Sequence, residues 1–85
     1  MPVKRFNLSK KVNKDISKLP LRIQNKIDKA FDGLKLDPLL GVKLHGELGD
    51  YYKFRVGDYR IIYSFNSSTA TLEIIRVEHR QGVYK

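Results

Sequence analysis

The chain has 85 residues, enough for one hydrophobic core and too few for two, so we expect a single domain spanning residues 1–85. The 17 Lys and Arg against 9 Asp and Glu give a formal net charge of +8, which predicts a polyanionic partner. The absence of cysteine excludes disulfides, thiol catalysis and cysteine-based metal sites, and the N-terminus has no apolar leader, so a cytoplasmic location and no membrane partner are expected.

The first part of the chain predicts a short strand and two helices. Residues 3–6 alternate apolar and basic side chains, which favours a strand. Apolar residues recur at helical spacing over residues 10–19, and an Asn and a Ser just before them are candidate caps. Pro20 ends that helix. A second apolar stripe predicts a helix over residues 21–36, which Asp37-Pro38 terminates.

The second part is organised around a β-hairpin. Gly57-Asp58 is typical of a two-residue turn of type II′, because glycine stands first, and side chains alternate on both sides of it. One face of the hairpin is then apolar and the other gathers three cations. The predicted cross-strand pairs are Val56 with Tyr59, Phe54 with Ile61, Tyr52 with Tyr63, Arg55 with Arg60, and Lys53 with Ile62.

A third strand is expected over residues 71–77, after a polar turn. Its apolar residues do not alternate cleanly, which predicts a central strand buried on both faces for part of its length. Residues 37–49 are expected to form a loop whose leucines and valine pack against the core. The fold class is therefore α+β: a short N-terminal strand, an antiparallel helix hairpin, and a three-stranded antiparallel meander covered by the helices on its apolar face. We expect the opposite face to be concave and basic.

The cationic face of the hairpin, with Lys53, Arg55 and Arg60, is the candidate functional site. Two arginines directly across a ladder repel, and a local cost of this kind can mark the place of an anionic ligand. A solvated basic surface is the alternative. The isolated histidines and the absence of a Gly-rich phosphate loop or a nucleophile elbow predict neither a metal nor a cofactor.

Cleavage of RNA without a metal fits these residues. The ribose 2′-OH supplies the nucleophile, so the protein must take its proton, stabilise charge on the phosphorane and protonate the leaving 5′-oxygen. Arginine suits the second task, because its fork matches two phosphate oxygens. Lys53 is a candidate base, and His79 could act as acid or base, since histidine titrates near neutral pH. Tyr84 could stack on a nucleobase or donate a proton. The alternatives are a surface position for His79 and packing of the C-terminal tail for Tyr84.

Several motifs of the chain resemble the RelE/ParE superfamily of toxins from bacterial and archaeal toxin–antitoxin pairs. The motifs are Leu44-x-Gly46, Tyr52-Lys53-Phe54-Arg55, Gly57-Asp58-Tyr59-Arg60-Ile61-Ile62-Tyr63 and His79-Arg80-x-x-Val83-Tyr84. The resemblance to RelE-like members implies a toxin that cuts mRNA in the ribosomal A site without a metal. ParE-like members keep this fold and inhibit DNA gyrase, and a basic RNA-binding homologue with little activity is a third possibility. The tyrosine in the tail favours the RelE side.

The resemblance also implies which residues form the site. The matching catalytic positions are Lys53, Arg55, Arg60, Arg80 and Tyr84. Arg55 stands where RelE-like enzymes can use a lysine as the base, and arginine is a poor base, so that role passes to Lys53 or to His79, which adjoins Arg80. The residues expected to bind RNA are Lys53, Arg55, Arg60, Arg80 and Lys85.

The partners that the resemblance implies are the ribosome with its mRNA and a cognate RelB-like antitoxin. A basic face suits an acidic, partly disordered antitoxin that folds on binding and covers the site. Direct recognition of DNA by this chain is not expected, because neither predicted helix has the pattern of a helix that binds in a DNA groove.

Overall fold

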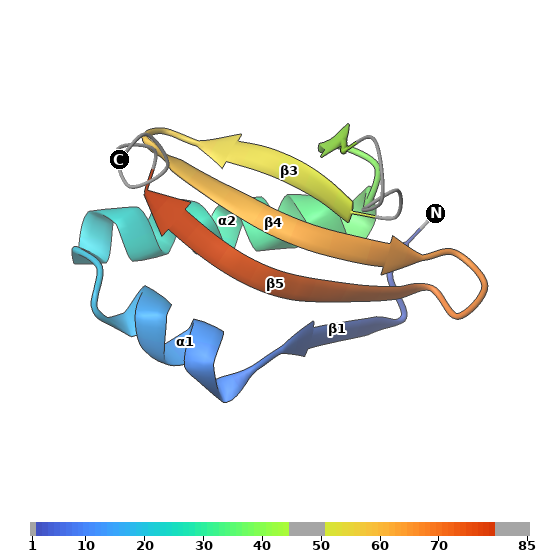
Figure 1. Cartoon of the computed structure of the whole chain (residues 1–85), viewed down its shortest axis with the longest axis horizontal. Helices are drawn as coiled ribbons and strands as arrows, with labels where there is room; N and C mark the ends of the chain where they lie inside the picture. Colours follow the sequence, from blue (N-terminus) through green and yellow to red (C-terminus); the bar gives the residue numbers. More distant parts are fainter. Residues whose placement is uncertain (1, 45–50, 80–85) are drawn as a thin grey trace.

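The computed structural model describes residues 2–44 and 51–79, in which two helices lie on one side of a five-stranded sheet (Figure 1). In chain order the elements are β1 (Arg5–Leu8), α1 (Lys10–Ser17), α2 (Leu21–Leu36), β2 (Val42–Lys43), β3 (Tyr51–Val56), β4 (Tyr59–Asn66) and β5 (Thr71–His79). The predicted α+β class is confirmed, with every predicted helix and strand present and some boundaries shifted by up to two residues.

The sheet is larger than predicted and is mixed rather than wholly antiparallel. Its strand order is β1-β5-β4-β3-β2. β1 joins the meander by pairing in parallel with β5, and the two-residue strand β2 pairs with β3 inside the region predicted to be a loop. The sequence pattern could not show either feature, because parallel pairing joins segments far apart in the chain and two residues are too few for a periodic signal.

The first helix begins with a side-chain cap. The Ser9 hydroxyl accepts a hydrogen bond from the Val12 N–H at 3.1 Å, so Ser9 is the cap. The helix ends at Ser17, two residues before the predicted end, because the N–H groups of Lys18 and Leu19 bond three residues back and tighten the last turn.

The second helix has the predicted bounds. Pro20 precedes it as the N-cap, and the Pro20 carbonyl accepts hydrogen bonds from the N–H groups of Ile23 and Gln24. In Figure 1 the chain reverses between α1 and α2, and α2 runs behind the sheet. The core joins both helices to one sheet face. Its buried members are Val12, Ile16, Ile27, Phe31, Leu34, Ile61, Tyr63, Phe65, Leu72 and Ile74.

The hairpin of β3 and β4 has the predicted register at all five pairs. Gly57 has a φ of +58°, and Asp58 after it is not among the described residues with a positive φ. A positive φ at the first turn residue alone is the signature of type II′, and only glycine adopts it without strain. The local turn chemistry therefore sets which side chains face the helices.

The broken alternation of β5 has a different cause from the predicted one. Leu72 and Ile74 pack into the core, but the next core contact comes three positions later, at Val77. The ladder to β4 shifts register here, which leaves Ile75 without a direct partner. β5 does lie between two other strands, as predicted, but a β-bulge rather than burial on both faces explains its pattern.

The loop after α2 is anchored by a tyrosine rather than by most of the apolar residues predicted to hold it. Leu39, Leu40 and Val42 are exposed, contrary to the prediction. The buried Tyr63 hydroxyl instead donates to the Pro38 carbonyl at 2.8 Å and accepts from the Gly41 N–H at 2.9 Å. Burial raises the pKa of Tyr63 to about 12, with the Gly41 hydrogen bond opposing the shift.

Neither described helix has the length and apolar character needed to cross a membrane.

Candidate functional site

Lys53, Arg55 and Arg60 lie on the sheet face opposite the helices, which we call the open face. Arg55 and Arg60 are direct partners across the ladder, and Lys53 is two positions before Arg55 on β3, so all three share one side. Phe54 between them packs on the core side. We call these three residues the basic cluster, and the structure brings them together as the sequence predicted.

The two facing arginines of the basic cluster contact partners on opposite sides. The Arg55 Nε donates to the Gly57 carbonyl at 3.4 Å, toward the hairpin turn. The Arg60 Nη1 instead lies 3.9 Å from Glu78 Oε1 on β5. The repulsion expected across this ladder position is therefore reduced by partners on opposite sides, and both guanidinium groups stay on the open face.

Two charged residues of β5 complete this surface, and the sequence prediction missed both. Glu78 is the ladder partner of Arg60. Arg76, two positions earlier on the same side, places its Nε 3.3 Å from Glu78 Oε2. The Glu78 carboxylate thus bridges two arginines, one through each oxygen.

The β-bulge is the reason for that omission. Simple alternation from Leu72 and Ile74 would send Arg76 and Glu78 toward the helices, whereas the extra residue at the bulge turns both onto the open face. The sequence does contain a signal for this orientation, namely the apolar Val77 between two charged residues. Charged side chains are rarely buried without a partner, so Val77 rather than Arg76 or Glu78 should face the core.

His79 is not brought together with the basic cluster. It is the ladder partner of Tyr59, and the two rings meet edge to face with their centroids 4.8 Å apart. Alternation from Val77, which packs against the core, puts His79 on the helix side of β5. His79 thus lies on the face opposite Lys53, and its role as acid or base stays a prediction. Arg80, Tyr84 and Lys85 lie outside the described residues.

Exposure differs among the charged groups of the open face. Lys53 is partly buried, and the side chains of Arg60 and Glu78 are about a quarter exposed, at 28% and 26%. Arg55 is exposed, and the side chain of Arg76 is 64% exposed. At the hairpin end of this face, four cations and one carboxylate therefore meet solvent, which suits a phosphate-rich ligand. In the described part of the chain, no group of three His, Asp or Glu residues is placed to hold a metal ion.

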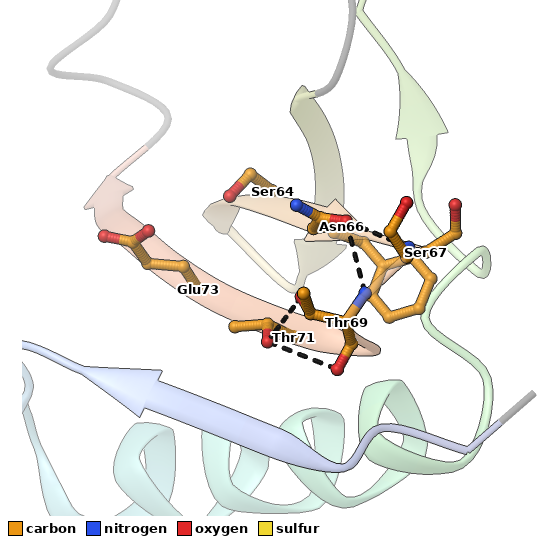
Figure 2. A pocket seen from close by; sticks show the side chains of 8 residues that line it. Ser64, Asn66, Ser67, Thr69, Thr71 and Glu73 are labelled. Carbon is orange, nitrogen blue, oxygen red and sulfur yellow. Dashed lines mark hydrogen bonds between the residues drawn. The ribbon is translucent and has the colours of Figure 1, made fainter.

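A polar hollow of about 530 Å³ lies at the other end of β4, around the turn to β5 (Figure 2). It is lined by Ser64, Phe65, Asn66, Ser67, Ser68, Thr69, Thr71 and Glu73. Several of its polar groups bond to one another: the Asn66 Oδ1 accepts from the N–H groups of Ser68 and Thr69, and the Thr69 hydroxyl donates to that of Thr71. Among the described residues that line this hollow there is no arginine or lysine, so the cations at the hairpin end remain the candidate site.

Comparison with known proteins gives a consistent result. A family model described as the ParE toxin of the type II toxin–antitoxin system parDE matches residues 6–84. Toxin RelG from Mycobacterium tuberculosis is 36% identical over 74 residues, which cover 85% of this chain and 85% of RelG.

Solved structures show the same fold. The crystal structure of a toxin–antitoxin complex from M. tuberculosis aligns with a TM-score of 0.80 and 33% identity, covering 94% of each chain. That of an archaeal RelE–RelB complex from Pyrococcus horikoshii aligns with a TM-score of 0.81 and 31% identity, covering 94% of this chain and 97% of the other.

Proposed function

The chain belongs to the RelE/ParE superfamily of toxins from type II toxin–antitoxin systems, and we propose that it is a metal-independent, ribosome-dependent endoribonuclease that cuts mRNA and so inhibits translation. The observation that carries this proposal is the basic cluster, in which one lysine and two arginines share the open face at the hairpin. Gyrase inhibition by binding alone would not require a lysine beside two paired arginines on one face.

Each residue of the basic cluster has a role in this chemistry. Lys53, which is partly buried, takes the proton from the ribose 2′-OH. Arg55 and Arg60 stabilise the charge that develops on the phosphorane oxygens, because guanidinium groups bind such oxygens in pairs. Tyr84, with Arg80 near it in the chain, remains the proposed group for protonating the leaving 5′-oxygen or stacking on a base. His79 is left out of this scheme because of its position beside Tyr59.

We also propose an acidic, RelB-like antitoxin as the partner of this chain. The two solved relatives described above are toxin–antitoxin complexes, one of them with RelB. The surplus of cations on the open face provides a surface that an acidic chain could cover in place of RNA.

Primer extension on cellular mRNA after brief expression tests the nuclease. We expect discrete, codon-phased cuts with the wild-type protein and their loss in Arg60→Ala. The variant lacks one hydrogen-bond donor to the charge of the transition state, so the rate of cleavage should fall by about 100-fold or more. Arg22→Ala, an exposed arginine on α2, is the matched control and should cut normally. Cuts that persist in Arg60→Ala would contradict the assigned role.

Gyrase inhibition is the second candidate, because the matching family model is described as a ParE toxin. In that case expression would cause DNA damage while mRNA stays intact, and the same experiment would show no cuts. Expression without any effect on growth would instead indicate an RNA-binding homologue without activity.

A further inference from the structure

The ion-pair bridge on β5 goes beyond the three cations of the proposed site. Arg76 and Arg60 stand on neighbouring strands and share one carboxylate, with Glu78 Oε1 3.9 Å from Arg60 Nη1 and Glu78 Oε2 3.3 Å from Arg76 Nε. An ion pair that solvent can reach adds little to stability. Its main physical effect is to restrict the orientation of two long side chains.

The bridge leaves most of the donors of both arginines available. The Arg60 contact is longer than a hydrogen bond, and the Arg76 contact engages Nε alone, so within these described pairs both terminal nitrogens of Arg76 keep their donors. With its side chain 64% exposed, Arg76 can meet a ligand without any rearrangement of the core.

Three arginines of the open face form an oblique line across the sheet, because Arg76 pairs with Ile62 and so lies two positions along from Arg60. Arg55 on β3, Arg60 on β4 and Arg76 on β5 occupy successive strands of the open face. Adjacent strands are about 4.8 Å apart, so β3 and β5 are separated by about 10 Å. Long guanidinium side chains at this spacing can reach successive phosphates of an RNA backbone that crosses the strands.

We infer that Arg76 is a further phosphate-binding residue for RNA, and that Glu78 is a positioning residue that holds Arg60 and Arg76 at adjacent places on this line. The inference rests on the proposed function. Because Glu78 itself is anionic, it repels the RNA backbone slightly while orienting both arginines, so it should improve the rate of cleavage at a small cost in affinity.

The RNA phosphate could belong to mRNA or to ribosomal RNA, and two binding assays separate these sources. One uses a fluorescein-labelled 2′-O-methyl oligouridylate of about 12 nucleotides, which cannot be cut and spans a typical single-strand site. The other uses ribosomes programmed with an mRNA that carries 2′-O-methyl groups at the A-site codon. Each is measured over a range of salt concentrations for the wild type, Arg76→Gln and Arg22→Gln, the last being a matched charge loss on α2.

We expect Arg76→Gln to weaken binding by about two- to fivefold, and to reduce the slope of log affinity against log salt by about 0.7, as for one lost phosphate contact. An effect in both assays would assign the contact to mRNA, and an effect on ribosomes alone would assign it to ribosomal RNA. Equal losses in Arg76→Gln and Arg22→Gln, or none in Arg76→Gln, would overturn the inference and leave the nuclease proposal intact. Absence of wild-type binding in both assays would overturn both.

Glu78→Gln tests the positioning role through the two kinetic constants. We expect kcat on programmed ribosomes to fall about tenfold, since Arg60 loses the group that orients it, while KM stays the same or decreases. Glu78→Asp should restore part of kcat because it restores the charge. An unchanged kcat, or a KM that rises with no change in kcat, would show that Glu78 does not position Arg60.

Discussion

Arg60 and Tyr63 are three positions apart on β4 and therefore point to opposite faces of the sheet. Arg60 meets solvent and the Glu78 carboxylate, whereas Tyr63 is fully buried and bonds to the loop after α2. The same strand thus contributes one side chain to the charged surface and another to the core. A change at Arg60 should affect activity, and a change at Tyr63 should affect stability.

Tyr63→Phe should lower the free energy of unfolding by about 1 to 3 kcal/mol, because the buried Pro38 carbonyl and the Gly41 N–H would both lose a hydrogen-bond partner. Urea denaturation at neutral pH measures this change. A loss of less than a few tenths of a kcal/mol would mean that the loop does not depend on the hydroxyl.

The same residue should make stability depend on alkaline pH. The pKa of Tyr63 is about 12 in the folded protein against 10.0 for the free side chain, so above pH 10 the unfolded chain releases a proton that the folded chain keeps. Stability from this group is thus complete below pH 10 and is lost as the pH rises to 12, by roughly 2 to 3 kcal/mol. Denaturation from pH 9 to 12 should show a smaller decline in Tyr63→Phe than in the wild type, and parallel declines would refute the linkage.

At the scale of elements, two glycines differ in the space available for a side chain. Gly33 lies inside α2, where an added Cβ would meet Leu40 Cδ1 at an ordinary 3.7 Å. Gly41 lies just before β2, where a Cβ would come within 2.5 Å of the Tyr63 hydroxyl oxygen and 2.7 Å of the Lys53 carbonyl oxygen. The loop can therefore reach the sheet edge only where no side chain intervenes.

Gly33→Ala should stabilise the protein by about 0.5 to 1 kcal/mol, because alanine loses less backbone entropy in a helix. Gly41→Ala should destabilise it by about 1 to 3 kcal/mol through overpacking. Thermal unfolding of the two variants and the wild type measures both changes in stability, and each variant serves as the control for the other. Shifts of the same sign would show that the contacts around Gly41 are not limiting.

At the scale of the whole molecule, positive charge is spread over both layers. The first 36 residues, which form β1 and the helices, contain ten of the 17 basic residues and three of the nine acidic ones. The sheet half has a nearly balanced charge but concentrates cations on the open face. The long-range field should therefore attract a polyanion from most directions, and only the open face should bind it in a defined way.

This distribution predicts how binding kinetics depend on salt. The association rate constant for the 2′-O-methyl oligouridylate should fall at least about tenfold between 20 and 200 mM salt, because steering by net charge is screened. The effect of Arg22→Gln should be confined to this association step, while Arg76→Gln should also speed dissociation. Stopped-flow fluorescence separates the two constants, and a dissociation rate unaffected by Arg76→Gln would speak against a direct contact.

The amino-acid sequence alone determined the features that depend on neighbouring residues. The apolar period of residues 21–36 and the Asp-Pro after them defined α2, and glycine as the first residue of a two-residue turn set the register of β3 and β4. That register was sufficient to place Lys53, Arg55 and Arg60 on one face, since alternation along a strand is a local rule.

Only the tertiary structure decided the features that arise between distant segments. Three such features depend on how the sheet closes against the helices. They are the parallel pairing of β1 with β5, the bonds of Tyr63 to a loop more than 20 residues away, and the bulge that turns Arg76 and Glu78 outward. In β5 two local preferences conflict, strict alternation and burial of Val77, and the free energy of core packing resolved that conflict by inserting a bulge. The bridged arginines beside the basic cluster are the result.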